Sequence, residues 1–469
     1  MYLDIDRKPA DSTAVVEDTG NQYTYGELVE FCGEFHGWIP DRNLILILCR
    51  NTMAAVAYYV ASIENRIVPL LISSRMDAEL RDALIGVYGP RYICLPGEME
   101  DAFSGCGYKK IAHKYGYVVL ETQYPVCEMA AELSMLLTTS GSTGSPKLVR
   151  HSYVNLEESA RNVAGFFGFH GDDRSLIDLQ LHYTMGLNVA CSSLYAGAAL
   201  MMTTHTAMEK EYWEFFDRSH ITNITGVPYN YEMLKRLKFF TRDYPDLRIL
   251  AEGGGKLTDK MFAEVAEYAA RTGKKFFATF GTSETTARIA YLPPHMAVQK
   301  TGSIGRAIPK GELFLVDEGR NVIRTQEAEG ELAYRGANVT LGYALCREDL
   351  KKGDERGGVY YTGDLARRDQ DGYYYILGRN SRFLKLYGYR VGLDECERLI
   401  RSEFGIECAC AGTDAGMKIY IIEERHSDAV RKYLARKLGI QISSFEVRVV
   451  PQIPKNEVGK ILYGDLNIK

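Results

Sequence analysis

A segment rich in hydroxyl groups and glycine carries the strongest chemical signal in this chain. It follows an apolar run, Leu133 to Leu137, that is typical of a buried strand, and it ends at Lys147. Glycine lets the backbone approach a ligand closely, free amides and hydroxyls donate hydrogen bonds, and the lysine adds a positive charge. This combination predicts a loop that holds polyphosphate. The loop residues are Thr139, Ser140, Gly141, Ser142, Thr143 and Gly144.

The spacing of this loop differs from that of a Walker P-loop. In the Walker pattern a lysine directly follows the second glycine and a helix begins at once. Here Lys147 lies three positions after Gly144, and the stretch that runs on to His151 predicts a second short strand. The spacing therefore argues against a P-loop kinase or ATPase. A plain surface loop is the remaining alternative, and the motifs further along the chain disfavour it.

The segment resembles the phosphate loop of the AMP-forming adenylating enzymes, which include acyl-CoA synthetases, adenylation domains of peptide synthetases and luciferases. That superfamily has the pattern Thr-Ser-Gly-Ser/Thr-Thr-Gly-x-Pro-Lys-Gly. The chain matches it from Thr139 to Lys147 and departs at Leu148, where the superfamily has glycine. The resemblance implies that the loop and Lys147 bind the phosphates of ATP.

Two further segments match motifs for the acid and for adenine. His182 lies in a segment that resembles the one in which a histidine or an aromatic residue walls the acyl pocket. A run of three glycines resembles the turn whose backbone lies along adenine. The glycines are Gly253, Gly254 and Gly255.

The stretch from Phe280 to Glu284 matches the aromatic-Gly-x-Thr-Glu motif of the superfamily, with Gly281 at the glycine position. By this match Phe280 stacks on adenine, Ser283 forms a hydrogen bond near the phosphate, and Glu284 holds magnesium. Magnesium takes oxygen ligands, commonly one or two carboxylates together with substrate phosphates. The resemblance thus implies ATP and Mg²⁺ as partners of this segment.

Three motifs near the end of the chain complete the match. Asp364 ends a Thr-Gly-Asp whose carboxylate accepts both ribose hydroxyls in the superfamily, and Arg379 would reach the ribose or a phosphate. Gly388 belongs to the hinge motif, although Ser381 stands where the superfamily usually has Asp or Lys. Lys460 matches the catalytic lysine of the C-terminal Gly-Lys motif. The candidate catalytic residues are then Lys147, His182, Glu284 and Lys460.

The resemblance implies a reaction in two steps. AMP is transferred from ATP to a carboxylate, pyrophosphate leaves, and a thiol of CoA or of a phosphopantetheine arm then attacks the adenylate. Between the steps the small domain rotates and exchanges Lys460 for the loop of Gly388. Two alternatives stay open: a freestanding ligase that loads an acyl carrier protein, and an inactive nucleotide-binding scaffold of the same fold.

The class of acid depends on one position near His182. Adenylation domains for α-amino acids usually carry an aspartate there, which pairs with the substrate ammonium, whereas this chain has Tyr183. An unpaired buried ammonium is costly. We therefore expect a small-molecule carboxylic acid without an α-amino group, such as a fatty or aryl acid.

The elements that must position these residues alternate between strands and helices. Leu44 to Cys49, Val68 to Ile72 and Arg91 to Leu95 predict strands, and helices are expected near Met53 to Ile63 and after the Asp77 cap. This alternation predicts an α/β fold with parallel sheets covered by helices.

From about Gly302 short strands and turns indicate a small β subdomain, with a hairpin turn at Gln370 to Gly372. After Arg379 the pattern reads helix, strand, strand, helix, strand. We expect a large adenylating domain at 1–380 and a small mobile α+β domain at 381–469.

Composition supports an ordinary globular enzyme. The chain has 469 residues, a length that exceeds one hydrophobic core and suits two or more domains. Its content of 46% hydrophobic and 25% charged residues is ordinary for a globular protein. The net charge of −5 gives no support for binding nucleic acid or an anionic membrane. Ten scattered cysteines, no signal core and no apolar run near the length of a membrane helix favour a cytoplasmic protein.

Overall fold

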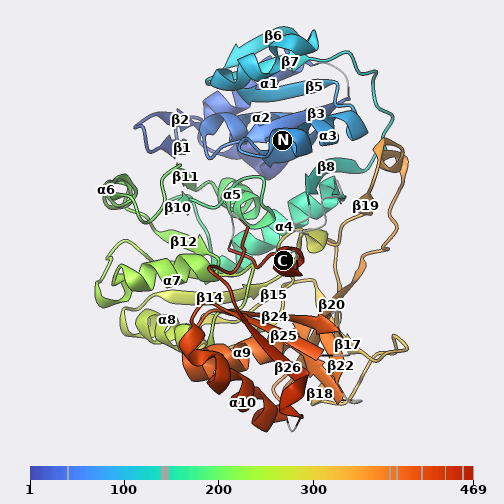
Figure 1. Ribbon diagram of the computed structural model, residues 1–469. Helices are drawn as coiled ribbons and strands as arrows, with labels where there is room; N and C mark the ends of the chain where they lie inside the picture. Colours follow the sequence, from blue (N-terminus) through green and yellow to red (C-terminus); the bar gives the residue numbers. More distant parts are fainter. Residues whose placement is uncertain are drawn as a thin grey trace.

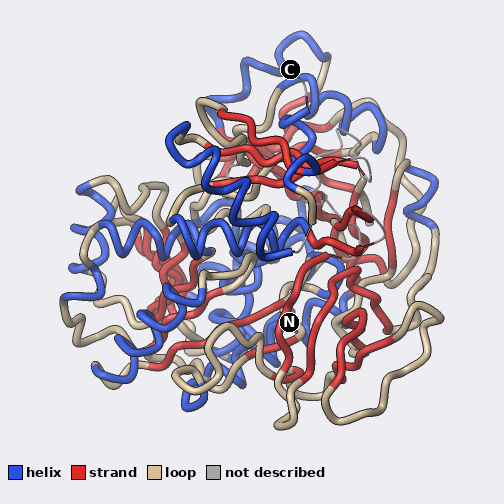
Figure 2. The backbone as a smooth tube through the Cα atoms, turned by 60° about the horizontal axis from the view of Figure 1, so that its bottom comes forward, coloured by secondary structure: helices blue, strands red, loops and turns tan. Residues whose placement is uncertain are grey.

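The computed structural model describes residues 1–39, 42–138, 147–379, 382–386, 389–413, 416–438, 440–456 and 459–467. The strands form two large sheets, a smaller antiparallel sheet, and a C-terminal unit (Figure 1). Figure 2 shows the helices, in blue, packed beside and over the strands, in red. None of the helices in these ranges is long and apolar enough to cross a membrane.

The first large sheet has eight strands in the order β19-β9-β8-β4-β3-β5-β7-β6. Its central strands are parallel, as predicted, but the outer strands β6, β7, β9 and β19 pair antiparallel with their neighbours. The strands span Leu44–Cys49 (β3), Val68–Ser73 (β4), Tyr92–Pro96 (β5), Lys109–Lys114 (β6), Tyr117–Glu121 (β7), Leu133–Thr138 (β8), Leu148–Ser152 (β9) and Gly342–Ala344 (β19).

The second large sheet has nine strands in the order β16-β15-β14-β13-β12-β10-β11-β1-β2. The five strands from β14 to β11 run parallel, so their carboxyl ends meet at one edge. The strands span Thr13–Glu17 (β1), Gln22–Thr24 (β2), Arg174–Ile177 (β10), Ala199–Met202 (β11), Asn223–Gly226 (β12), Ile249–Glu252 (β13), Lys275–Phe280 (β14), Ala290–Tyr291 (β15) and Arg306–Ala307 (β16).

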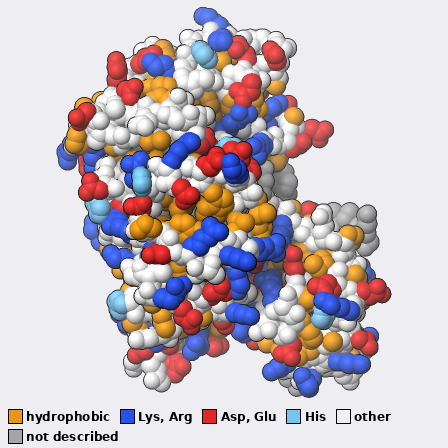
Figure 3. Space-filling model, turned by 90° about the vertical axis from the view of Figure 1, so that its left-hand side faces the viewer, with side chains coloured by type: hydrophobic (Ala, Val, Ile, Leu, Met, Phe, Trp, Pro, Cys, Tyr) orange, Lys and Arg blue, Asp and Glu red, His pale blue; other side chains and the backbone are white. Residues whose placement is uncertain are grey.

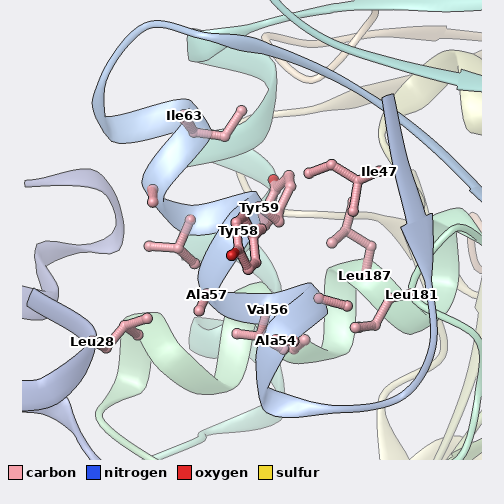
Figure 4. Packing of buried hydrophobic residues seen from close by; sticks show 14 of the residues in the cluster. Leu28, Ile47, Ala54, Val56, Ala57, Tyr58, Tyr59, Ile63, Leu181 and Leu187 are labelled. Carbon is pink, nitrogen blue, oxygen red and sulfur yellow. The ribbon is translucent and has the colours of Figure 1, made fainter. Parts of the chain in front are cut away.

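Helices between these two sheets form the main core. Helix α2 is buried along nearly its whole length, from Met53 to Ile63, and packs with residues of both sheets in one apolar cluster (Figure 4). The helices of the large part span Tyr25–Trp38 (α1), Met53–Glu64 (α2), Ala78–Tyr88 (α3), Tyr153–Phe167 (α4), Thr184–Ala196 (α5), Lys210–Arg218 (α6), Pro228–Arg236 (α7) and Asp259–Arg271 (α8).

Local sequence signals set several helix ends. The side chain of Thr24 accepts a hydrogen bond from the amide of Glu27, and the Glu27 carboxylate accepts one from the Thr24 amide, so α1 begins with a capping box. Asp77 caps α3, and Gly89 ends that helix in the left-handed conformation. Short 3₁₀ helices span Tyr2–Arg7, Gly97–Cys106, Phe239–Thr241, Ser283–Thr285, Pro294–Met296, Arg347–Lys351, Glu424–His426, Ile442–Ser444 and Tyr463–Asn467.

The predicted β subdomain is a four-stranded antiparallel sheet in the order β17-β18-β20-β21. Its strands span Glu312–Val316 (β17), Ala328–Arg335 (β18), Val359–Arg368 (β20) and Tyr374–Arg379 (β21). Gly372 takes a positive φ of 78° between β20 and β21, as the predicted hairpin turn requires.

The C-terminal unit has its own apolar core, built from residues between Leu384 and Phe445. The predicted order of helix, strand, strand, helix, strand is present, but a short hairpin that we did not predict precedes it. The elements span Phe383–Leu386 (β22), Tyr389–Gly392 (β23), Leu393–Phe404 (α9), Cys408–Thr413 (β24), Gly416–Ile421 (β25), Ser427–Leu438 (α10) and Phe445–Val449 (β26).

Candidate active site

The predicted magnesium residue lies directly after the carboxyl end of β14. The chain leaves this strand through Gly281, where a Cβ would overlap the carbonyl oxygen of Ala287, so only glycine allows the turn. A 3₁₀ turn over Ser283–Thr285 then places Glu284 at the sheet edge, half-buried. Carboxyl ends of parallel strands are the usual place for ligands in such sheets.

The carboxylate and carbonyl of Glu284 are held from two sides. The Tyr343 hydroxyl donates to Glu284 Oε1 over 2.6 Å. The Glu284 carbonyl accepts hydrogen bonds from the amide and hydroxyl of Thr340, at 3.0 and 2.9 Å. Burial, with the nearby Glu284 carboxylate, raises the pKa of Tyr343 to about 12, so its hydroxyl stays protonated and can donate. These contacts fix the direction of a carboxylate whose hard oxygens suit magnesium.

Lys147 approaches the same tyrosine. Its Nζ lies 3.4 Å from the centroid of the Tyr343 ring, because Tyr343 on β19 pairs with Val149 on β9, two residues after the lysine. The loop that precedes Lys147, Thr139 to Gly144, lies outside the described residues, so its predicted phosphate contacts stay a prediction.

The glycine turn after β13 closely approaches the start of α5. A Cβ on Gly254 would lie 2.5 Å from the Tyr183 hydroxyl oxygen, and one on Gly253 would lie 2.8 Å from Met185 Cε. A Cβ on Gly255 would lie 2.8 Å from Pro228. The close packing explains why three glycines follow one another.

Tyr183, rather than His182, faces the glycine turn in the structure. His182 is half-buried, its Nδ1 has no hydrogen-bond partner among the described residues, and burial lowers its pKa to about 4. The imidazole is therefore neutral near pH 7. The sequence motifs give Tyr183 no role of its own, beyond the absence of an aspartate at this position. In the structure Tyr183 is the residue that precedes α5.

Two predicted residues reach this region from neighbouring elements. Ser283 Oγ lies 2.7 Å from the hydroxyl of Thr184, the first residue of α5. Phe280 ends β14, next to the strand that carries the glycine turn, and is partly buried. The adenine and phosphate candidates thus lie along one sheet edge.

The ribose candidates form a cross-strand pair in the β subdomain. Asp364 on β20 lies opposite Arg379 on β21, and Arg379 Nε is 3.5 Å from Asp364 Oδ1. Asp364 is only 6% exposed, and burial raises its pKa to about 6, although Arg379 acts in the opposite direction. A buried carboxylate of this kind needs hydrogen-bond donors, which ribose hydroxyls supply.

Lys460, in the C-terminal unit, is subject to the charges of Asp364 and Arg379 as well. Its loop lies against α7, since a Cβ on Gly459 would be 3.1 Å from Cβ of Tyr229. Burial, followed by the charge of Arg379, lowers the pKa of Lys460, whereas Glu284 and Asp364 raise it. The charges of Glu284, Asp364 and Arg379 thus act on Lys460, while Gly388 lies outside the described residues.

A family model described as AMP-binding enzyme matches residues 4–344. The chain belongs to this family. A 2-succinylbenzoate–CoA ligase of Geobacillus kaustophilus is 28% identical over 348 residues, which cover 71% of this chain and 69% of that protein. A long-chain-fatty-acid–CoA ligase of Salmonella typhimurium is 28% identical over 375 residues, covering 76% and 64%. The aligned part therefore spans about two thirds of the length of these AMP-binding relatives.

Solved structures of this family share the whole fold. The O-succinylbenzoate coenzyme A synthetase of Bacillus subtilis in complex with AMP matches with a TM-score of 0.81 and 21% identity, over 100% of this chain and 98% of that chain. Another structure of that protein holds ATP and a magnesium ion. The family resemblance and the fold class predicted from the sequence are both confirmed.

Proposed function

We propose that this protein is an AMP-forming acid–thiol ligase, which activates a carboxylic acid as acyl-AMP, releases pyrophosphate and passes the acyl group to CoA. One observation carries the proposal: two carboxyl groups and two cations from three separate parts of the chain lie close enough for their charges to act on one another. They are Glu284, Asp364, Arg379 and Lys460.

The arrangement suits adenylation because the reaction gathers negative charge. A carboxylate repels nucleophiles, and its attack on the α-phosphate of ATP brings two anions together. Cations fixed in a partly desolvated site stabilise that charge without reorganising. Lys460 would act at the carboxylate and α-phosphate, and Lys147 at the phosphates. A magnesium ion held by Glu284 would neutralise phosphate charge.

Other residues would bind and orient the nucleotide. The backbone of Gly253 to Gly255 and the ring of Phe280 would hold adenine, and Asp364 would accept the ribose hydroxyls. Arg379 would contact the ribose or a phosphate, Ser283 would bond near the phosphate, and His182 would wall the acyl pocket. The loop from Thr139 to Gly144 completes the phosphate site. Positioning of this kind supplies much of the rate in phosphoryl-type transfers.

A division of the chain near residue 380 would suit a two-step mechanism. The buried apolar residues of the C-terminal unit, from Leu384 to Phe445, form a cluster of their own, and the loop of Lys460 lies against α7. Residues 381–469 would rotate after adenylation, withdrawing Lys460 and presenting the loop of Gly388 to the thiol.

All ten cysteines are free, which fits a reducing cytoplasm.

Apolar packing around the glycine turn favours an acid without an α-amino group. Tyr183 contacts a cluster of Leu179, Met185 and Val227. Glu252, the residue before the glycine turn, is buried, and this burial raises its pKa well above the usual value. To act as the counter-ion of an ammonium group, Glu252 would first have to ionise, which its burial disfavours.

A screen of carboxylic acids by adenylation-dependent pyrophosphate release tests the proposal. We expect organic acids without an α-amino group to outperform every proteinogenic amino acid. An amino acid that is tenfold better than all plain acids would contradict the argument from Tyr183. Supplying CoA or a phosphopantetheinylated carrier protein as acceptor separates the two ligase alternatives, and failure of pyrophosphate exchange with every acid would favour an inactive scaffold.

A further inference from the structure

An arginine that the sequence motifs do not include lies beside the magnesium candidate. The Arg356 guanidinium carbon is 4.6 Å from the centroid of the Tyr343 ring and 4.9 Å from that of Tyr360. Its Nη1 donates to the Glu284 carbonyl oxygen over 3.2 Å and also to the Thr340 hydroxyl. Two aromatic rings and two hydrogen bonds therefore hold the guanidinium next to the backbone of Glu284.

Two cations converge on one aromatic ring. Lys147 Nζ is 3.4 Å from the centroid of the Tyr343 ring, which Arg356 also contacts. Neither cation forms an ion pair with a carboxylate in the described ranges. The nearest acidic neighbours of Arg356 in sequence are engaged elsewhere, because Glu355 pairs with Arg150 and Asp354 accepts the Arg356 amide.

Two cations that contact the same ring repel one another, and an anion bound beside them offsets this repulsion. The Arg356 guanidinium also keeps donors available, since its bonds to described residues use Nη1 and leave Nη2 and Nε without described partners. A planar guanidinium can donate two parallel hydrogen bonds to phosphate oxygens, which a lysine cannot. The pair Lys147 and Arg356 therefore fits a ligand with several phosphate charges.

We propose that Arg356 binds the β- and γ-phosphates of ATP, and the pyrophosphate they form, as a second cation beside Lys147. The inference rests on the proposed function, because that function supplies the polyphosphate. AMP lacks these two phosphates and should not depend on Arg356. The comparison between ATP and AMP therefore separates a polyphosphate contact from a general effect on the nucleotide site.

The test measures binding without any acid substrate. Affinities of wild type, Arg356→Gln and Arg356→Lys are measured by calorimetry for ATP, AMP and inorganic tripolyphosphate at fixed Mg²⁺. Arg320→Gln is the matched control, since Arg320 also stacks on a tyrosine, 4.5 Å from the Tyr361 ring centroid, in the same subdomain. Melting temperatures of all variants report on folding.

We expect Arg356→Gln to weaken ATP and tripolyphosphate binding about tenfold and to leave AMP binding unchanged, as loss of a charged hydrogen bond predicts. Arg356→Lys should fall between this variant and wild type, and Arg320→Gln should match wild type. Equal weakening of AMP and ATP, or no weakening of either, would overturn the inference. If the proposed ligase activity itself fails, wild type releases no pyrophosphate with any acid, whatever these binding results are.

Discussion

Replacing Lys460 should separate the two half-reactions. In the structure the charges of Glu284 and Asp364 act on the ammonium of this half-buried lysine, which we propose acts in adenylation. At an effective dielectric constant of about 20, two unit charges about 4 Å apart interact by about 4 kcal/mol. Partial exposure reduces this figure, and about 3 kcal/mol corresponds to about a hundredfold loss of rate in Lys460→Ala.

The assay follows each step separately. Pyrophosphate release from ATP and the best acid measures adenylation, and thioester formation from chemically prepared acyl-adenylate measures thiol transfer. Lys460→Ala should slow the first by about two orders of magnitude and leave the second near the wild-type rate, because no charge develops at the α-phosphate when a thiol attacks the finished adenylate. Gly388→Trp should show the reverse pattern, by obstructing the proposed thiol path.

A lysine in the same loop provides the control. Lys455 pairs with Glu407 over 2.6 Å within the C-terminal unit, so Lys455→Ala tests a general loss of charge or folding there. It should leave both half-reactions nearly unchanged. If Lys460→Ala slows both steps equally, this lysine does not act in one orientation alone, and the rotation of residues 381–469 is refuted for this protein.

The remaining predictions concern the carboxyl groups of the site. Glu284→Gln should lower adenylation by about a hundredfold with little change in melting temperature; an equal loss of both would make Glu284 structural. Tyr343→Phe keeps the ring but deletes the 2.6 Å hydrogen bond to Glu284, so the Mg²⁺ concentration for half-maximal rate should rise about tenfold. Tyr374→Phe, which loses a bond to a carbonyl outside the site, should not change it. Because burial raises the pKa of Asp364 to about 6, we expect its carboxyl to become protonated and to accept ribose hydroxyls less well as the pH falls. The KM for ATP should therefore rise below pH 6, and Asp364→Asn should remove this dependence.

Local signals in the sequence were sufficient for the elements of the large part. Strand β3 has the predicted bounds, Leu44–Cys49, because six consecutive apolar residues can be buried on both faces of a parallel sheet. The start of α1 is also set locally, because Thr24 and Glu27 bond each other's amides within one turn. Such features depend on neighbours in sequence, so a single chain contains the information.

Two features of the fold lacked a local signal. The hairpin strands Phe383–Leu386 and Tyr389–Gly392 have only four residues each, one of them basic. The same stretch matches the hinge motif, which predicts no strand. Strands of four residues also show little periodicity. The antiparallel edge Lys109–Lys114 is mostly polar, since one side of an edge strand meets water, and it gave no run of buried residues.

The motif order identified most of the candidate site, whereas the contacts within it needed the structure. Lys147 and Tyr343 are 196 positions apart in sequence (343 − 147), yet they meet because β19 returns to pair with β9. Arg356 belongs to no motif that we used, and an isolated arginine in a polar loop is usually solvated. Its stacking on Tyr343 and Tyr360 and its hydrogen bonds to Glu284 and Thr340 are seen only in the structure.

The composition of the site also bears on how residues 381–469 can move. The face of the molecule in Figure 3 carries charged side chains of both signs. Lys460, in contrast to such exposed charges, is half-buried, and burial lowers its pKa. Taking an ammonium from water costs free energy, which the attraction of Lys460 to Glu284 and Asp364 offsets only in part, because its pKa is lowered on balance. In the proposed rotation Lys460 would regain its hydration as it loses these partners, so the two effects would act in opposite directions. Binding of ATP adds negative charge next to Lys460 and should favour the adenylating orientation. Release of pyrophosphate removes part of that charge, and we therefore expect it to precede rotation.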